Sequence, residues 1–148
     1  MPSTHSSLHY HIVFSSKDRE PWFHGEMITD LHAYLGGVVN GLDGHSHING
    51  GVSDHVHLLV GLKPIHRLSD FMSELKSVSS SWVKKRLRAP AFRWQEGYGA
   101  FTVGAPELGK VREYIANQAE HHRKKTFQEE YVTMLNRGMV EYKEEHLW

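Results

Sequence analysis

Residues 45–62 read HSHINGGVSDHVHLLVGL, a pattern that predicts a β-hairpin. Two strands are expected, over residues 45–53 and 55–62, and the second contains a continuous apolar run of strand length. The turn between them falls at Asp54 or at the glycine pair Gly50-Gly51. An antiparallel pair of strands is therefore expected near the middle of the chain.

The second strand of this hairpin carries two histidines that should share one face. Successive side chains of a strand alternate between its faces, so His55 and His57 point one way while Val56 and Leu58 point the other. If the two apolar residues pack beneath helices, both imidazoles emerge together on the opposite face. Such a pair can hold one metal ion.

The segments on either side of the hairpin predict a ferredoxin-like fold. The pattern predicts a strand over residues 8–15, an amphipathic helix over 23–40, a second helix over 68–87 with Ser69 as N-cap, and a short strand over 100–103. This order is typical of an α+β sandwich in which helices cover one face of a four-stranded antiparallel sheet. The other face is expected to be free.

Two further helices are expected near the C-terminus, over residues 106–121 and 128–136. Pro106 suits the first turn of the earlier helix because its missing N–H has no partner to lose there. Tyr114 and Gln118 are four residues apart on that helix, so they should lie along one side of it.

Composition limits the class of protein without identifying a partner. The chain has 148 residues, of which 39% are hydrophobic, so residues 1–148 are expected to form a single domain with one core. The absence of cysteine excludes disulfides and thiolate metal sites. No membrane span or secretory signal is recognisable in the sequence, so a soluble, cytoplasmic protein is expected.

Charge is distributed unevenly although the formal net charge is zero. The sum gives no reason to propose nucleic acid as a partner. However, an acidic C-terminal stretch balances a basic middle that contains no carboxylate between residues 76 and 93. A run of this kind is commonly a solvated helix face. Its basic residues are Lys76, Lys84, Lys85, Arg86, Arg88 and Arg93.

Histidine is abundant, with 13 residues in the chain. Three pairs have the form His-x-His, and in a strand each pair could present two imidazoles to one ion. The spacing alone does not choose among them. The pairs are His9 with His11, His45 with His47, and His55 with His57.

Two strand histidines combined with Tyr114 and Gln118 suit the transesterification of a phosphodiester. A tyrosine hydroxyl has an ordinary pKa of about 10, so it needs an activated electrophile. A divalent cation held by neutral ligands polarises the phosphoryl oxygen and steadies the leaving 3′-oxygen. A plainer interpretation places Tyr114 in the core and Gln118 in solvent. Tyr98 is another candidate nucleophile, but it lies in a glycine-flanked loop and has no glutamine four residues on.

Three stretches together resemble the TnpA-like single-tyrosine HUH transposases. They are DHVHLLV at residues 54–60, WQEGYGAF at 94–101 and YIANQAEHH at 114–122, and the resemblance covers nearly the whole chain, starting at residue 10. These enzymes belong to small insertion sequences that move as single-stranded DNA, and they have REP-associated domesticated relatives. Three motifs in the same order make chance agreement improbable.

The resemblance implies roles for individual residues. His55 and His57 would be metal ligands, Gln118 the third ligand, and Tyr114 the nucleophile that forms a 5′-phosphotyrosine link and leaves a free 3′-OH. The metal would be Mg²⁺ or Mn²⁺, and strand rejoining would need no nucleotide cofactor.

The resemblance also implies partners. Family members are dimers, in which the tyrosine helix can complete the partner's active site, and they recognise single-stranded DNA with hairpin ends. The six basic residues between 76 and 93 would then contact this DNA.

Three other functions compete with this interpretation. A domesticated relative would act on host repeats with the same catalytic residues. A non-catalytic dimeric DNA-binding protein would keep the fold without cleavage, although the intact set of Tyr114, Gln118, His55 and His57 argues against such decay. A zinc hydrolase would need a carboxylate near the ligand strand, and the sequence offers only Asp54 there.

Overall fold

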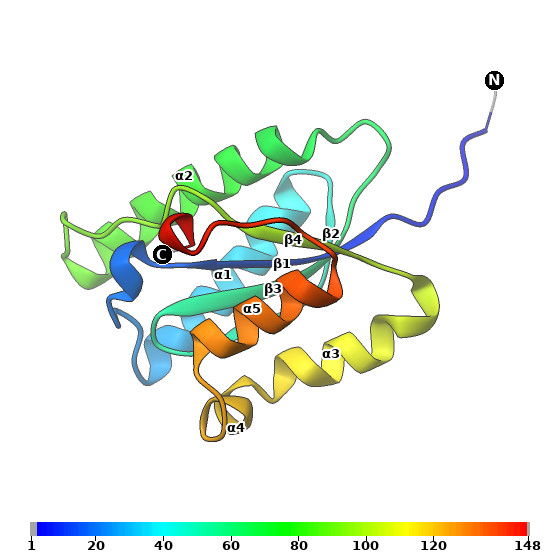
Figure 1. The fold of residues 1–148 in the computed structure, drawn as a ribbon. Helices are drawn as coiled ribbons and strands as arrows, with labels where there is room; N and C mark the ends of the chain where they lie inside the picture. Colours follow the sequence, from blue (N-terminus) through cyan, green and yellow to red (C-terminus); the bar gives the residue numbers. More distant parts are fainter. Residues whose placement is uncertain (1–2, 148) are drawn as a thin grey trace.

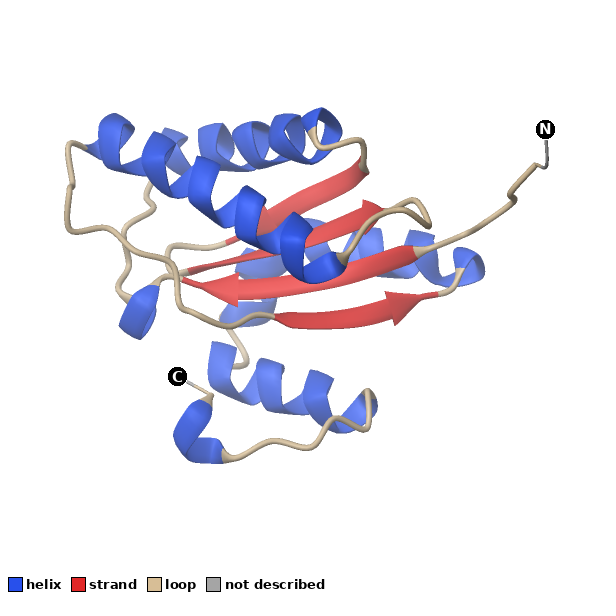
Figure 2. Ribbon diagram, turned by 90° about the horizontal axis from the view of Figure 1, so that it is seen from above, coloured by secondary structure: helices blue, strands red, loops and turns tan. Residues whose placement is uncertain are grey.

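A four-stranded antiparallel sheet forms the centre of the molecule, as the sequence predicts. The structure is a computed structural model and describes residues 3–147. The strands lie in the order β2-β3-β1-β4, with every neighbouring pair antiparallel (Figures 1 and 2). They are β1 (His9–Ser15), β2 (His45–Gly51), β3 (His55–Gly61) and β4 (Gly99–Val103).

One face of the sheet packs against α1 (Glu26–Gly41) and α2 (Leu68–Leu87). Val56 and Leu58 of β3 are fully buried in this core, as the alternation of the strand predicts. The remaining sheet and helix residues of the core follow the same periodicities. They include Ile12, Phe14, Val60, Leu31, Leu35, Phe71 and Leu75.

The opposite face of the sheet is covered, so the expectation of a free face is wrong. Helices α3 (Leu108–Ala116), α4 (Gln118–His122) and α5 (Phe127–Arg137) pack on this side (Figure 1). Two small apolar clusters hold them there, one around Val13 and one around Leu59. The side chains on this face are therefore enclosed between the sheet and the C-terminal helices.

The helix expected over residues 106–121 is interrupted. A 3-10 turn occupies Ala105–Glu107, and Asn117 separates α3 from α4 with φ −103° and ψ 27°. Asparagine tolerates such a conformation better than most helix residues because its side chain competes for backbone hydrogen bonds. Tyr114 and Gln118 consequently belong to two helices.

Helix starts differ from the expectation at α2 and agree closely at α5. Arg67 is the residue that precedes α2, so Ser69 lies inside the helix and is not its N-cap. At α5, Thr126 and Glu129 form a reciprocal capping box. This cap fixes where α5 begins and therefore which of its residues face the sheet.

None of the helices in residues 3–147 combines the length and apolar character that crossing a membrane requires.

Gly50 allows α3 to approach the edge strand β2. A Cβ at Gly50 would lie 2.6 Å from the carbonyl oxygen of Ile115 and 2.7 Å from its side chain. Because the obstacle is partly backbone, α3 would have to move to admit even a methyl group. Gly50 thus lies within β2 and not in the turn, which the chain makes after Gly51.

Gly50→Ala is therefore expected to destabilise the protein by about 1–3 kcal/mol through overpacking against α3. Urea denaturation monitored by circular dichroism would measure this loss. Gly37→Ala is the matched control, because a Cβ at Gly37 on α1 meets nothing within 4 Å, and a helical alanine should be neutral or stabilising. Equal stability of the Gly50 variant and wild type would contradict the close approach.

Candidate active site

The side chains predicted to do chemistry converge between β3 and the C-terminal helices. His55 and His57 are fully buried and extend from β3 toward α3, α4 and α5. Gln118 enters from the start of α4, and Glu130 enters from α5. The chain brings these four groups together within one subunit.

Glu130 lies at the centre of this cluster, with 4% of its surface exposed. Its Oε1 atom is 3.1 Å from Nε2 of His57, 3.7 Å from Nε2 of His55 and 3.4 Å from Nε2 of His122. Its Oε2 atom accepts hydrogen bonds from the Tyr114 hydroxyl and, at 3.3 Å, from Nε2 of Gln118. One oxygen therefore faces imidazoles and the other faces the phenol.

Both strand histidines are oriented by a partner on Nδ1. Asp54 Oδ1 lies 2.8 Å from Nδ1 of His55, and His11 Nε2 lies 2.8 Å from Nδ1 of His57. A carboxylate can only accept, so the proton of neutral His55 is on Nδ1 and its Nε2 carries a lone pair. Anchoring one ring nitrogen in this way is how proteins orient imidazole ligands toward a metal.

Burial keeps His57 and His11 neutral. It lowers the pKa of His57 to about 4, helped by the charges of His55 and His122 and opposed by Glu130. It also lowers the pKa of His11 to about 3, together with the charge of His57. Neutral imidazole is the form that binds metals.

Glu130 is ionised and the Tyr114 phenol is neutral, because their pKa values shift in opposite directions. Burial favours neutral Glu130, but hydrogen bonds from His122 and His57 outweigh it and keep its pKa below the usual range. Burial and the adjacent Glu130 carboxylate raise the pKa of Tyr114 above its usual value. Tyr114 is thus a neutral phenol that donates to an ionised carboxylate.

The donor set of the cluster fits a divalent metal. His55, His122 and Glu130 each offer a ligand atom within 4.8 Å of the others. Gln118 Oε1 lies 3.3 Å from Nε2 of His55 and 3.1 Å from Nε2 of His122. Imidazole nitrogens combined with carboxylate and amide oxygens suit Mn²⁺ and Zn²⁺. The carboxylate and amide oxygens also suit Mg²⁺.

A cleft of about 380 Å³ opens beside the nucleophile candidate. Tyr114 and Glu130 line it together with two cations, Lys125 and Arg137. Arg137 is close enough for its charge to act on the Tyr114 hydroxyl. The cleft therefore offers a positive environment next to the phenol.

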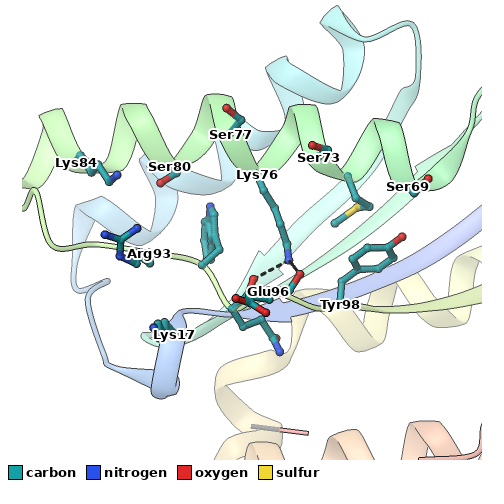
Figure 3. A pocket seen from close by; sticks show the side chains of 13 residues that line it. Lys17, Ser69, Ser73, Lys76, Ser77, Ser80, Lys84, Arg93, Glu96 and Tyr98 are labelled. Carbon is teal, nitrogen blue, oxygen red and sulfur yellow. Dashed lines mark hydrogen bonds between the residues drawn. The ribbon is translucent and has the colours of Figure 1, made fainter. Parts of the chain in front are cut away.

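Three of the basic residues expected to contact DNA line a different cleft, of about 690 Å³, between α2 and the loop over residues 93–98 (Figure 3). Lys84 and Arg93 lie at one end of it. Lys76 donates to the carbonyl oxygens of Gln95, Glu96 and Gly97 at 2.8, 3.2 and 2.5 Å. Lys76 thus holds this loop against α2, and its contact with DNA stays a prediction.

The other basic residues lie at the C-terminal end of α2. Lys85, Arg86 and Arg88 are exposed, and Arg86 forms an ion pair with Asp30 at 3.0 Å. Tyr98, the other nucleophile candidate, lines the cleft of Lys76, whereas Tyr114 lines the cleft of Glu130. The structure therefore places Tyr114, and not Tyr98, beside the histidine cluster.

Sequence patterns single out neither Glu130 nor His122 and name His11 only within a His-x-His pair, although Glu130 leaves a detectable signal. Phe127, Tyr131 and Leu135 form the buried stripe of α5, and Glu130 lies on that stripe. An acid on the apolar side of an amphipathic helix is unusual and indicates a buried partner. Glu130 also supplies a carboxylate near the ligand strand, where the sequence offers only Asp54 to the zinc-hydrolase alternative.

The amino-acid sequence is similar to those of known transposases. The family described as "Transposase IS200 like" matches residues 4–118. The transposases of insertion sequence element IS200 from Salmonella typhimurium and Salmonella typhi are each 29% identical over 120 residues, which cover 77% of this chain and 78% of theirs.

Solved structures share the fold. A candidate transposase from Deinococcus radiodurans is 23% identical, with a TM-score of 0.64 over 80% of this chain and 95% of that one. A REP-associated tyrosine transposase bound to a REP hairpin is 12% identical, with a TM-score of 0.58 over 82% of this chain and 74% of that one. These similarities confirm the α+β sandwich.

The depressed pKa values of His11 and His57 predict acid-sensitive folding of the metal-free protein. An unfolded histidine binds a proton near pH 6.5, but these two bind theirs in the folded chain only near pH 3 and 4. The free energy of unfolding should therefore fall as pH drops from 6.5 to 4, by up to about 1.4 kcal/mol per pH unit for each group.

His11→Gln tests this linkage because the glutamine amide can still donate a hydrogen bond to Nδ1 of His57 but does not titrate. Urea denaturation with chelator at several pH values should give a shallower pH dependence for this variant than for wild type. His146→Gln, which replaces an exposed histidine, serves as control. Parallel curves for all three proteins would show that His11 titrates normally in the folded state.

Proposed function

The chain belongs to the family of IS200-like transposases, and from this premise we propose that it cleaves and rejoins single-stranded DNA through a 5′-phosphotyrosine intermediate on Tyr114. One observation carries the proposal. The Tyr114 hydroxyl donates to Glu130, and the same carboxylate contacts His57 and Gln118. The nucleophile and the metal-ligand candidates therefore share one buried anion.

Cleavage would begin with attack of the Tyr114 oxygen on phosphorus. As that O–P bond forms, the phenol proton becomes acidic and passes to Oε2 of Glu130, which already accepts it in a hydrogen bond. The bond from phosphorus to the 3′-oxygen breaks, and the 3′-oxygen takes a proton from solvent. Attack of a 3′-OH on the phosphotyrosine reverses these steps and rejoins DNA without ATP.

His55 and His57, through Nε2, and Gln118, through Oε1, would hold the divalent metal. Glu130 Oε1 faces the same space and adds a negative ligand. A bound Mg²⁺ or Mn²⁺ polarises the phosphoryl oxygen and stabilises the leaving oxygen. His11 contacts Nδ1 of His57, and Asp54 contacts Nδ1 of His55. These contacts direct Nε2 of both rings toward the same space.

The cleft beside Tyr114 would receive the scissile phosphate. Lys125 and Arg137 line it and offset the charge that the phosphodiester brings. Neither residue lies in the basic stretch that the sequence singles out. This cleft would position the substrate at the Tyr114 hydroxyl, whereas the basic end of α2 borders the other cleft.

Hairpin DNA would contact the basic end of α2 and its cleft. Lys84 and Arg93 line the cleft together with Lys17, and Lys85 and Arg88 are exposed nearby in sequence. The structural neighbour that is bound to a REP hairpin supports DNA with hairpin ends as the partner class. Phosphate neutralisation by these cations would supply affinity without reading the sequence.

A homodimer in the cytoplasm is part of the proposal. Within residues 3–147, the outer side of β4 pairs with no other strand, and an unpaired strand edge favours association. One subunit alone brings Tyr114 to its own His57, with ring centroids 6.0 Å apart. Sedimentation equilibrium giving the mass of one chain would contradict the dimer.

Tyr114→Phe is expected to abolish covalent attachment of the protein to DNA. Wild type incubated with Mn²⁺ and labelled single-stranded DNA from the regions flanking its gene should give a protein–DNA band on a denaturing gel. Phenylalanine keeps the ring but removes the nucleophilic oxygen, so no band should form. Chelator should remove the wild-type band because the leaving oxygen loses its stabilisation.

Tyr98→Phe is the matched control and should retain the band, since Tyr98 lines the other cleft. If wild type binds the same DNA but forms no adduct with Mn²⁺, the non-catalytic DNA-binding function replaces the one proposed. Adduct formation by Tyr114→Phe would assign the nucleophile to another residue.

Replacing Lys84 and Arg93 together with alanine should weaken hairpin binding mainly at low salt. Each lost phosphate contact should reduce the slope of log K against log salt by about 0.7–0.9. Fluorescence anisotropy over a salt series would measure the slopes. Lys143→Ala, on the exposed C-terminal segment, is expected to match wild type. An unchanged slope in the double variant would remove this surface from the DNA interface.

A further inference from the structure

Three histidines at the far end of the sheet take no part in the proposed reaction. His9 lies on β1, and His45 and His47 lie on β2. His9 is four residues from Val13, which pairs with His57. At about 3.4 Å per residue, this separates His9 from the level of His57 by roughly 14 Å along the strand.

The sheet register brings these histidines around a glycine. His9 pairs with Gly61 on β3, and Gly61 pairs with His45. Because Gly61 has no side chain, the space above β3 between the side chains of β1 and β2 stays open. A register shift between Ser46 and Ile48 marks a bulge at His47, and bulges re-aim side chains.

Two ring nitrogens from different strands meet in this space. Nδ1 of His9 lies 3.1 Å from Nε2 of His47. Two ligands that each lie 2.0–2.1 Å from one ion are about 2.8–3.4 Å apart for bond angles between octahedral and tetrahedral. The Ser7 hydroxyl lies 3.1 Å from the other nitrogen of His9 and anchors that ring.

A third histidine and space for water lie beside this pair. The exposed His45 ring is 4.6 Å from the His47 ring, edge to face, and its side chain would have to turn to direct a nitrogen toward the pair. A hollow of about 460 Å³, lined by His9, His45 and Asp43, adjoins the cluster. Water molecules in this hollow can complete the coordination of an ion.

We propose that His9, His45 and His47 form a second metal site, distinct from the active site, which binds a borderline transition metal such as Zn²⁺. Imidazole suits Zn²⁺, Ni²⁺ and Cu²⁺, whereas Mg²⁺ prefers oxygen ligands. The ion joins β1 to β2 across β3, which lies between them. It therefore fastens the end of the sheet from which the N-terminal segment departs, independently of the proposed DNA chemistry.

Zn²⁺ stoichiometry measured by equilibrium dialysis of the tag-free, full-length protein tests the proposal. Wild type and His146→Gln should each bind one equivalent more than His9→Gln and than His47→Gln. Zn²⁺ should also raise the melting temperature of wild type more than that of the two variants, because binding to the folded state stabilises it. Two single variants guard against one that fails to fold.

His9→Gln and His47→Gln should still form the Mn²⁺-dependent adduct with DNA, since neither residue lies in the active site. This readout separates the second site from the proposed function. If both variants bind as much Zn²⁺ as wild type, the 3.1 Å contact is only a hydrogen bond between the two rings, and the second site does not exist.

Discussion

The buried carboxylate of Glu130 is the constraint around which the site is arranged. Removing an ion from water costs several kcal/mol unless charged or polar partners replace the lost hydration. His57, His122, Gln118 and Tyr114 provide these partners from three other elements. Glu130 therefore fixes where α5 lies on the sheet, and the same contacts bring the phenol to the imidazoles.

The alternating side chains of β3 separate an apolar core on one face of the sheet from a polar cluster on the other. Val56, Leu58 and Val60 belong to the apolar core under α1 and α2. His55 and His57, on the other face, meet the shorter C-terminal helices, whose apolar clusters are small. Most of the apolar burial thus lies away from the polar site, so the fold tolerates buried histidines on one face only because the other face supplies the core.

Local patterns predicted most of the fold and named four of the residues that the structure brings together around Glu130. Period-two and helical spacings gave all four strands and the main helices, and three motifs identified His55, His57, Tyr114 and Gln118 as a set. Glu130 lies more than seventy residues from His57 and becomes relevant only when α5 docks, which spacing cannot express. The covered sheet face escaped prediction for the same reason.

The two histidine clusters have different donor atoms and therefore favour different metal ions. The active-site cluster contains a carboxylate and an amide oxygen, so its charge and donors accommodate Mn²⁺ or Mg²⁺. The cluster of His9, His45 and His47 offers imidazoles, with the charge of Arg112 acting on His47. A hard ion gains little from such a site, whereas a borderline ion gains from nitrogen ligands alone. If both proposed sites are present, the chain would hold a structural ion without competing for the ion that the proposed phosphodiester chemistry would use.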